Sequence, residues 1–164
     1  MNTKQQKVIN YFSGFGSRLG YNFILGGVKH FGYYPNKRPG ISEKEAQNLL
    51  HDLVGKRLEL KPNQQILDAG CGQGIFATYL ASKFGSNITG ITIIPFEVEE
   101  AKKLAQKLGL NQKTKFSLMD YSNTKFRDRT FDGIYTTETL SHSPNIRKTL
   151  KEFFRILKPG GKFI

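Results

Sequence analysis

An acidic residue and three alternating glycines lie within seven residues of one another near the middle of the chain. Asp68 follows a short apolar run, and Gly70, Gly72 and Gly74 come after it at every second position. Glycine lets a backbone turn sharply and lets a ligand approach it without meeting a Cβ atom. The helix expected next offers unpaired N–H groups and a partial positive charge at its N-terminus. This arrangement predicts a site for a nucleotide-like cofactor at the end of a strand.

Two classes of cofactor compete for this turn. Residues 72–77 fit GxGxxA, the dinucleotide fingerprint, which requires an acid about 20 residues further on to bind a ribose. The second strand ends instead in Thr92, two isoleucines and a proline, and Glu97 is the first acid. S-adenosylmethionine (SAM) has no phosphate but carries an ammonium and a sulfonium, whose positive charge a carboxylate before the glycines can offset. The position of Asp68 therefore favours SAM.

Hydrophobic periodicity predicts the elements that position this turn. Ser42 to Glu45 matches a capping box, and a helix is expected from about Glu43 to Lys56. Further helices are expected after the glycine turn, from Pro95, and after the fourth strand. Strands are expected at residues 66–68, 87–94, 115–119, 131–136 and 162–164. Alternating strands and helices predict an α/β fold, a doubly wound, Rossmann-like parallel sheet flanked by helices.

The C-terminal part carries two further expectations. The buried face of the last helix is expected to comprise Ile146, Leu150, Phe153, Phe154 and Leu157. The fifth strand is expected to have only three residues, which would leave a sheet edge exposed. We therefore expect an incomplete sheet that lacks its last strands, in a chain truncated from a longer product; a compact natural variant is the alternative.

Charge and aromatic residues set the N-terminal part of the chain apart. The net charge is +12, and the first 42 residues contain six basic residues, eight of the twenty aromatic residues and no acid. Such a segment suits an anionic membrane surface or a nucleic acid, or is simply a solvated face over an ordinary core. We expect residues 1–41 to form a basic, aromatic lid or cap and residues 42–164 to form the cofactor-binding core.

Composition narrows the class of protein. The sequence contains no run of 18 apolar residues and no secretory signal. Its single cysteine, Cys71, excludes an internal disulfide, so a cytoplasmic location is expected. The spacing of His, Cys and Asp residues does not suggest a metal site.

Four segments together resemble class I SAM-dependent methyltransferases. LDAGCGQG (67–74) is similar to the first motif of that family, and MDYS (119–122) falls where an acid commonly meets the adenine amine. FDGIYTTETLSH (131–142) falls at the fourth motif, and LKPGGKFI (157–164) resembles the post-helix signature. The resemblance covers about Ser42 to the C-terminus and implies SAM as cofactor and methyl transfer as the activity.

A finer resemblance concerns the acceptor. GITIIPFEVEEA (90–101) and HFGYYP (30–35) are similar to segments of sterol C-methyltransferases, tocopherol-type C-methyltransferases and cyclopropane-lipid synthases. The chain departs from that group in having Glu97 where Gln is common. It also has three residues, Thr139 to Ser141, between Glu138 and His142.

The resemblance implies roles for residues of the strand ends. The residues expected to line the methionine and ribose part of SAM are Asp68, Gly70, Cys71, Gly72 and Gly74. Thr92 and Glu97 are candidates near the ribose, and Asp120 and Tyr121 near the adenine. Glu97 also begins a helix, where an acid complements the helix dipole, so both interpretations stay open.

Candidate catalytic residues depend on the acceptor. An acceptor that must lose a proton needs a base, for which Glu138, His142 and His30 are candidates. An alkene acceptor forms a carbocation, which aromatic faces and a carboxylate stabilise; Tyr33, Tyr34 and Glu138 suit that chemistry. Each residue also has a structural explanation, because a histidine can cap a helix and lid aromatics can simply pack.

Three functions stay open. The leading hypothesis is SAM-dependent methyl transfer to a small, apolar or lipid-like acceptor at carbon or oxygen, with peripheral contact to an anionic membrane. The alternatives are an RNA methyltransferase, favoured by the charge, and a non-catalytic SAM-binding fragment. The lack of an Asn/Asp-Pro-Pro-aromatic tetrad argues against methylation of adenine or glutamine amines. The position of the lone Cys71 excludes a Cys-nucleophile pyrimidine methyltransferase.

Overall fold

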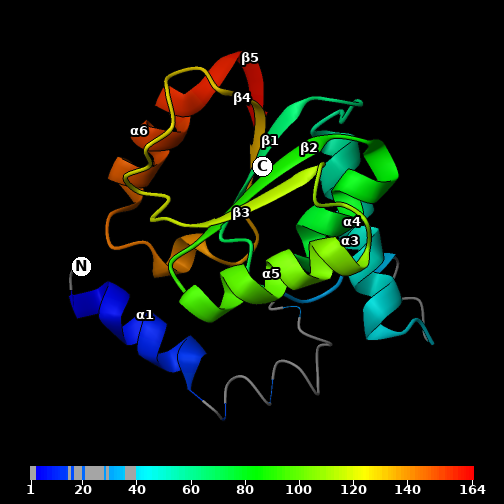
Figure 1. The fold of residues 1–164 in the computed structure, drawn as a ribbon, viewed down its shortest axis with the longest axis horizontal. Helices are drawn as coiled ribbons and strands as arrows, with labels where there is room; N and C mark the ends of the chain where they lie inside the picture. The colour runs from blue at the N-terminus through cyan, green and yellow to red at the C-terminus, as the bar shows by residue number, and fades with distance from the viewer. Residues whose placement is uncertain (1–2, 15, 17–19, 21–27, 29, 36–39) are drawn as a thin grey trace.

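A parallel sheet with helices on both faces is seen in a computed structural model, which describes residues 3–14, 16, 20, 28, 30–35 and 40–164 (Figure 1). Five strands lie in the order β3-β2-β1-β4-β5, and all neighbouring strands are parallel. Their bounds are β1 Gln65–Ala69, β2 Asn87–Thr92, β3 Thr114–Leu118, β4 Phe131–Tyr135 and β5 Leu157–Phe163. The predicted doubly wound sheet is confirmed, since the order runs outward from β1 in both directions.

Helices cover both faces of this sheet. α3 (Glu43–Arg57), α4 (Ile75–Phe84) and α5 (Pro95–Lys107) lie on one face, and α6 (Ile146–Ile156) lies on the other (Figure 1). α1 (Thr3–Ser13) contacts the short 3-10 helix η2 (Leu140–His142), which follows β4. Within the described part of the chain, no helix is both long enough and apolar enough to cross a membrane.

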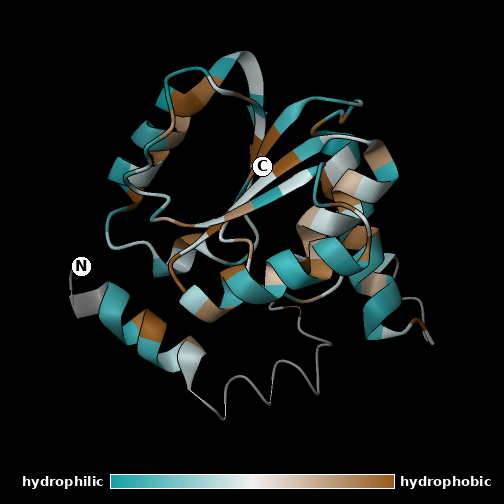
Figure 2. Ribbon diagram, in the orientation of Figure 1, coloured by the Kyte–Doolittle hydropathy of each residue, from teal (hydrophilic) through white to brown (hydrophobic). Residues whose placement is uncertain are grey.

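Two apolar cores result from the alternation of side chains along the central strands. On β1, Ile66 packs with residues of α3, α4 and α5, whereas Leu67 and Ala69 pack with Phe153 and Ile156 of α6. The central strands therefore carry hydrophobic residues, while much of the outer surface of α5 is hydrophilic (Figure 2). A strand that is buried on both faces gives the glycine turn at its end a fixed position.

Local signals in the sequence account for the helix ends. Ser42 Oγ accepts a hydrogen bond from the N–H of Glu45 at 3.2 Å, which confirms the N-terminal cap predicted for α3. Gly85 ends α4 with φ +71 and donates its N–H to the carbonyl of Ala81. The predicted helix boundaries are therefore correct to within one or two residues.

The last strand differs from the prediction. β5 has seven residues, because it begins at Leu157, which was assigned to the preceding helix. It pairs with β4 through Leu157 and again from Lys162 onward, with a register shift between the two. Pro159 has no N–H to donate, and Gly160 has φ +76, so the chain departs from regular pairing between these points.

The buried face of α6 was also predicted wrongly in part. Phe153 is buried as expected, but Ile146 and Leu150 are exposed, and 85% of Phe154 is exposed. The helix instead buries Thr149, Phe153 and Ile156, a stripe adjacent to the predicted one. Thr149 can be buried because its hydroxyl forms a hydrogen bond with Ser143 Oγ at 2.9 Å.

Candidate functional site

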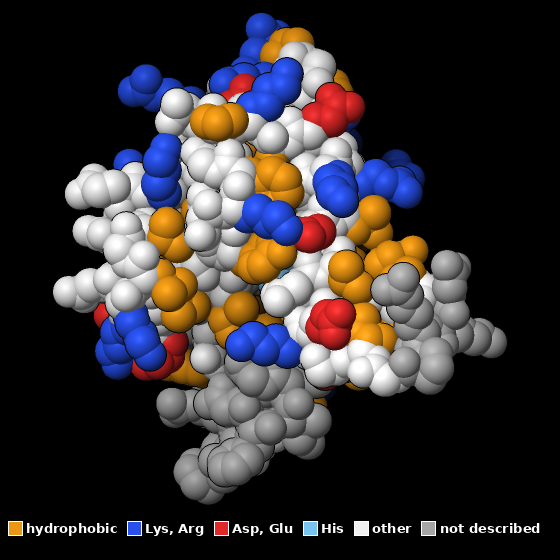
Figure 3. Space-filling model, turned by 90° about the vertical axis from the view of Figure 1, so that its right-hand side faces the viewer, with side chains coloured by type: hydrophobic (Ala, Val, Ile, Leu, Met, Phe, Trp, Pro, Cys, Tyr) orange, Lys and Arg blue, Asp and Glu red, His pale blue; other side chains and the backbone are white. Residues whose placement is uncertain are grey.

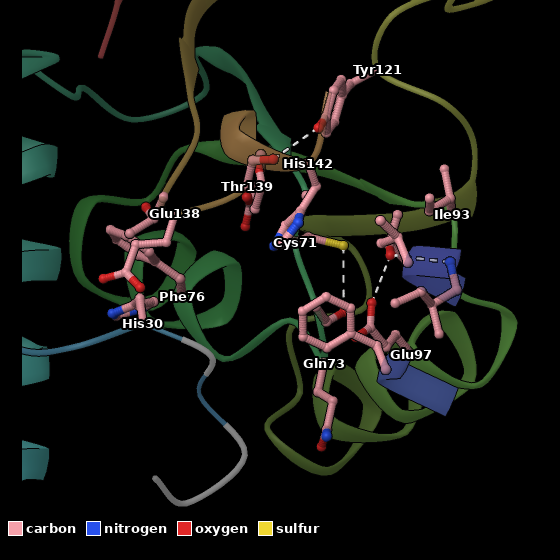
Figure 4. Close-up of a pocket in the computed structure, with 18 of the residues that line it drawn as sticks. His30, Cys71, Gln73, Phe76, Ile93, Glu97, Tyr121, Glu138, Thr139 and His142 are labelled. Carbon is pink, nitrogen blue, oxygen red and sulfur yellow. Dashed lines mark hydrogen bonds between the residues drawn. The ribbon is translucent and has the colours of Figure 1, made fainter. Parts of the chain in front are cut away.

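The carboxyl ends of β1, β2, β3 and β4 open into one cavity of about 200 Å³, which α1 also lines. Parallel strands bring their carboxyl ends to the same edge of a sheet, where open α/β sheets bind ligands. Figure 4 shows the lining residues: His30, Phe76 and Glu138 lie together at one end, and Ile93 and Glu97 lie at the other. We refer to these as the acceptor end and the cofactor end, after the roles that the sequence predicts for Glu138 and for Glu97.

The glycine turn is folded closely against its neighbours. The N–H groups of Gly70 and Cys71 both donate to the carbonyl of Ile91, at 2.9 and 3.0 Å. Gly70 has φ +99, and a Cβ atom there would lie 2.5 Å from Thr139 Cγ2. Gly72 has φ +52, and a Cβ atom there would meet no described atom within 4 Å. Glycine suits both positions, and Gly72 leaves its part of the cavity open to a ligand.

Gly74 lies outside the cavity in which it was expected. It is the N-cap of α4, with φ +77, and does not line the cavity. A Cβ atom there would lie 2.8 Å from Ala101 Cβ and from the ring of Phe116. The structure therefore places Gly74 in the packing of α4 against α5 and β3.

Asp68 is a buried acid at the end of β1. It is 3% exposed, lines the cavity, and accepts a hydrogen bond from the Tyr135 hydroxyl at 2.8 Å. Burial raises the pKa of Asp68 to about 7, and the Tyr135 hydrogen bond opposes that shift in part. A positive ligand group near Asp68 would favour the ionised carboxylate.

Cys71 lines the same part of the cavity as a protonated thiol. Burial, followed by the nearby carboxylates of Asp68 and Glu97, raises the pKa of Cys71 well above its ordinary value. Because the thiolate is the nucleophilic form, this cysteine does not serve as a nucleophile.

The end of β2 supplies a second buried carboxylate. The Thr92 hydroxyl donates to Glu97 Oε2 at 2.6 Å and accepts the N–H of Ile94 at 3.2 Å. This local turn ends β2 at Thr92, two residues earlier than predicted. Glu97 is 2% exposed, lines the cavity and lies in the first turn of α5. Its position is compatible with both the ligand and the dipole interpretation.

Asp120 and Tyr121 follow β3 and connect three parts of the site. Asp120 Oδ1 accepts the N–H of Ser122 at 2.7 Å, and its Oδ2 accepts Nε2 of Gln5 on α1 at 2.5 Å. The Tyr121 hydroxyl donates to the carbonyl of Thr139 at 2.9 Å. Burial, and next the charge of Asp120, raise the pKa of Tyr121 to about 12.

The loop after β4 joins the glycine turn to the acceptor end. The hydroxyls of Thr136 and Thr139 both donate to the carbonyl of Ala69, at 2.9 and 3.0 Å. Glu138 lies between them in chain order and has φ +55, a backbone conformation that residues other than glycine rarely adopt. Its Oε1 accepts the N–H of Phe31 at 3.1 Å. The loop therefore presents Glu138 to the cavity and holds the N-terminal segment there.

His142 lines the cavity in contact with an aromatic ring of α1. The ring of Phe12 on α1 lies 5.5 Å from that of His142, in an edge-to-face arrangement. Phe12, Phe76, His30 and His142 all line the cavity. In the described residues, no group of three or more His, Cys, Asp or Glu side chains is placed to hold a metal ion.

Tyr33 and Tyr34 lie outside the cavity. Tyr33 is 44% exposed, and its N–H donates to the carbonyl of Ala46 at 2.8 Å, while the Tyr34 hydroxyl donates to Glu43. These contacts attach the segment to α3. The structure therefore places Tyr33 outside the cavity that holds the other two candidate catalytic residues, Glu138 and His142.

Sequence reasoning missed several residues of the site or its support. Among them are Gln5 and Phe12 on α1, His51 on α3, and Tyr135 on β4. For His51 a signal was present, since it lies four residues after buried Gln47 and three before Val54 on one helix face. For Gln5, no local pattern predicts a contact with Asp120.

Known proteins resemble this chain in family, sequence and structure. The family model described as "Methyltransferase domain" matches residues 67–164. An S-adenosyl-L-methionine-dependent Diels-Alderase from Talaromyces variabilis is 37% identical over 163 residues, which are 97% of this chain and 55% of that protein. Sterol 4-C-methyltransferase from Caenorhabditis elegans is 39% identical over 140 residues, or 85% of this chain and 41% of that protein.

A solved structure has the same fold. The crystal structure of the (4+2)-cyclase SpnF superimposes with a TM-score of 0.86 at 30% identity, covering 98% of this chain and 58% of SpnF. The chain thus spans about half the length of the relatives that it matches. Both the family match and the identities lead to one conclusion: the chain belongs to the methyltransferase domain family.

Proposed function

We propose that this chain carries the cofactor site of a SAM-dependent methyltransferase, whose acceptor is small, apolar or lipid-like and is methylated at carbon or oxygen. The observation that carries the proposal is that Asp68, Gly72, Glu97 and Asp120 come from the ends of three strands and line one cavity. The similarity to a sterol methyltransferase supports the apolar acceptor. Because the chain spans about half the length of its relatives, the activity is proposed for the whole protein to which this site belongs.

The residues present fit SAM. Gly72 leaves open space beside the turn, and Asp68 offers a carboxylate that would ionise beside an ammonium group. Glu97 can accept hydrogen bonds from ribose hydroxyls, and Asp120 from an exocyclic adenine amine. When bound, SAM supplies an activated methyl group, so the protein's main task is to align the acceptor with it.

The acceptor end can orient an apolar molecule and move one proton. Phe12, Val28 and Phe76 provide apolar surface, and Glu138 provides a carboxylate that can stabilise positive charge. Glu138 and His142 are the side chains that could accept a proton from the acceptor. An RNA base or a strongly charged acceptor would have to desolvate against this apolar lining at a cost.

Isothermal calorimetry with SAM tests the cofactor site directly. The wild-type chain should bind SAM, and Asp68→Asn should weaken binding roughly 10- to 100-fold, because a charge-assisted contact is lost. Asp128→Asn is the matched control, since Asp128 pairs with Arg155 and its side chain is 71% exposed. Absence of SAM binding by the folded wild-type chain would overturn the proposal.

A cyclase is the second candidate function. It is favoured by the similarity to a Diels-Alderase and to SpnF, both at 30% identity or more. In such a protein the same fold would bind the cofactor without consuming it. Formation of S-adenosylhomocysteine during turnover separates the two functions: it should accumulate with product in a methyltransferase and stay absent in a cyclase.

The charge of the chain keeps RNA as a further acceptor to test. On the face seen in Figure 3, Lys and Arg side chains lie apart, with acidic and hydrophobic side chains between them. RNA affinity that falls steeply with added salt would support this alternative, because each neutralised phosphate releases counterions. Weak RNA binding at low salt would remove it.

We also propose that residues 1–41 act as a lid that approaches membranes. Much of this segment lies outside the described residues, but Gln5, Val8 and Phe12 on one face of α1 line the cavity. Tyr11 and Phe31 are exposed in the same segment, which the sequence makes basic. Sedimentation with anionic vesicles, and not with neutral ones, is the expected result; no sedimentation with either contradicts membrane contact.

A cytoplasmic location stays a prediction from the single cysteine.

A further inference from the structure

Two histidines are in direct contact behind the wall of the acceptor end. His51 on α3 is 1% exposed, and its Nε2 lies 3.1 Å from Nε2 of His30, which lines the cavity. The ring of Phe76, a second lining residue, stacks on His51 with 3.9 Å between centroids. His51 therefore supports two residues of the cavity wall without reaching the cavity itself.

The neighbours of this pair determine where its protons lie. His30 Nδ1 lies 3.0 Å from the carbonyl oxygen of Phe31, which can only accept, so His30 Nδ1 carries a hydrogen. In neutral His30 the other nitrogen, Nε2, then has a lone pair. Two lone pairs would repel each other at 3.1 Å, so His51 Nε2 carries the hydrogen and donates it to His30.

The remaining nitrogen of His51 strengthens this assignment. His51 Nδ1 is buried and has no hydrogen-bond partner among the described residues. If His30 were protonated, its Nε2 would donate to His51 Nε2, and His51 Nδ1 would become a buried N–H donor without an acceptor. In the neutral pair this nitrogen is a bare acceptor; protonation of His30 would replace it with an unpaired buried donor and would also bury a positive charge, so the neutral pair is the stable form.

The charged groups around the pair do not reverse this preference. Glu138 from the loop after β4 and Glu43 from α3 raise the pKa of His30, but desolvation is the larger influence and lowers it overall. Asp52 on α3 raises the pKa of His51, yet burial and His30 lower it to about 3. The ring of Tyr79 on α4 lies 5.0 Å from that of His51 between centroids. Both imidazoles are therefore neutral near pH 7.

We propose that His51 is a positioning residue: by donating Nε2–H it holds His30 as the Nδ1–H tautomer, with its lone pair turned away from the acceptor. His30 is then an uncharged part of the cavity wall and is not the base of the proposed methyl transfer. The proton-accepting role is left to Glu138 or His142. The part of this inference that concerns catalysis rests on the proposed methyl transfer, whereas the tautomers do not.

A wall of this kind suits an alkylating cofactor. A free imidazole lone pair facing the activated methyl group would be a competing nucleophile. It would also keep water at the wall of a cavity that must hold an apolar acceptor. Occupying that lone pair with a buried N–H donor removes both problems.

Nuclear magnetic resonance on the intact chain with ¹⁵N-labelled histidine tests the tautomers without any assay of activity. His30 should show a protonated Nδ1 and a bare Nε2, and His51 the reverse. A scalar coupling should connect the two Nε2 nuclei across the hydrogen bond. The chain has three histidines, so His142 supplies the third, unpaired signal. A His30 with hydrogen on Nε2, or no coupling between the rings, would overturn the inference.

Two substitutions of His51 separate positioning from packing. His51→Gln keeps an N–H donor near the Nε2 position, whereas His51→Leu fills space without one. In His51→Leu the ¹⁵N signals of His30 should begin to titrate, and kcat of the active protein should fall about tenfold with KM for SAM unchanged. His51→Gln should restore kcat and the fixed tautomer. If both variants retain a fixed His30 tautomer, His51 does not position it; if His51→Leu does not fold, the wild-type spectra decide alone.

Discussion

The two ends of the cavity are built by different means. At the cofactor end, Asp68 and Thr92 lie in the last two residues of strands of the central sheet, and Gly72 follows Asp68 by four residues. At the acceptor end, His30 and Glu138 come from segments more than a hundred residues apart and are joined by the hydrogen bond from Phe31 to Glu138. The cofactor end is thus a local product of strand and turn, and the acceptor end depends on tertiary contacts.

The two ends nevertheless use burial in the same way. Burial raises the pKa of an acid, Asp68, and lowers the pKa of two bases, His30 and His51. Each group is thereby driven toward its neutral form in the protein without ligand. The two ends differ in their response to a ligand, because a cationic cofactor can recharge Asp68, whereas the histidine pair satisfies its own hydrogen bond and stays neutral.

The largest effect is expected where the two ends meet, at Gly70. Gly70→Ala would place a side chain at φ +99 and 2.5 Å from Thr139, in the loop that carries Glu138. We expect a loss of about 2–5 kcal/mol in the free energy of unfolding, from backbone strain and overpacking together. Urea denaturation monitored by circular dichroism measures the loss.

Gly109 provides the matched control for that substitution. It also has a positive φ, +69, but a Cβ atom there meets nothing within 4 Å, so Gly109→Ala should cost only about 1–2 kcal/mol. Adding Thr139→Gly to Gly70→Ala should recover part of the loss by removing the clash. Equal losses for the two alanine variants would mean that the contact between the turn and the loop does not matter.

The contrast between the ends also explains which parts of the site the sequence could predict. The cofactor end was predictable because Asp68, the glycines and Thr92 belong to short motifs at strand ends. The position of Tyr33 could not be predicted because an aromatic segment of the N-terminal part gives no information on which neighbour it contacts; Tyr33 lies against α3. The pairing of His30 with His51 could not be predicted, since it depends on how that segment folds over α3.

The fold followed the same rule. Strand and helix alternation was sufficient for the parallel sheet, because each βα unit is local. The buried face of α6 could not be predicted in this way, since the apolar residues of the helix form two adjacent stripes. In addition, burial of Thr149 depends on Ser143 from the preceding loop. Where a polar residue is buried by a partner outside its helix, periodicity alone selects the wrong face.

The second prediction concerns stability and pH, where the two ends should act with opposite sign. Between about pH 5 and pH 6, folded Asp68 holds a proton that the unfolded chain has lost, so acidification stabilises the fold through this group. His51 does the reverse, because the unfolded chain takes up a proton that folded His51 refuses. Each contributes about 1.4 kcal/mol per pH unit.

Variants at the two ends should therefore change the slope in opposite directions. Relative to the wild type, Asp68→Asn should lose stability faster as the pH falls, and His51→Gln should lose it more slowly or gain it. Urea midpoints measured across this pH range give the slopes. Parallel slopes for the three proteins would show that burial does not control these groups.

A third prediction sharpens the idea that the cofactor recharges Asp68. A nearby ammonium lowers the pKa of Asp68 from about 7, so binding releases a proton. As the pH is raised toward 7, SAM affinity should increase by up to about tenfold per pH unit, and above pH 7 it should level off. Calorimetry in two buffers with different ionisation enthalpies counts the released protons. In Asp68→Asn the pH dependence should be reduced to that of the cofactor itself; an unchanged profile would exclude Asp68 as its source.

The smallest effect is expected at α1, where two neighbouring glutamines allow a matched comparison. Gln5 donates to Asp120 at the adenine position, whereas Gln6 is exposed and bonds to Asn10 of its own helix at 3.0 Å. Gln5→Ala should weaken SAM binding about three- to tenfold, because the Asp120 carboxylate loses one of the two hydrogen bonds that it accepts from described residues, and with it its orientation. Gln6→Ala should leave the affinity unchanged. Since both substitutions remove the same atoms from the same helix, equal affinities for the two variants would mean that α1 covers the cavity without taking part in cofactor binding.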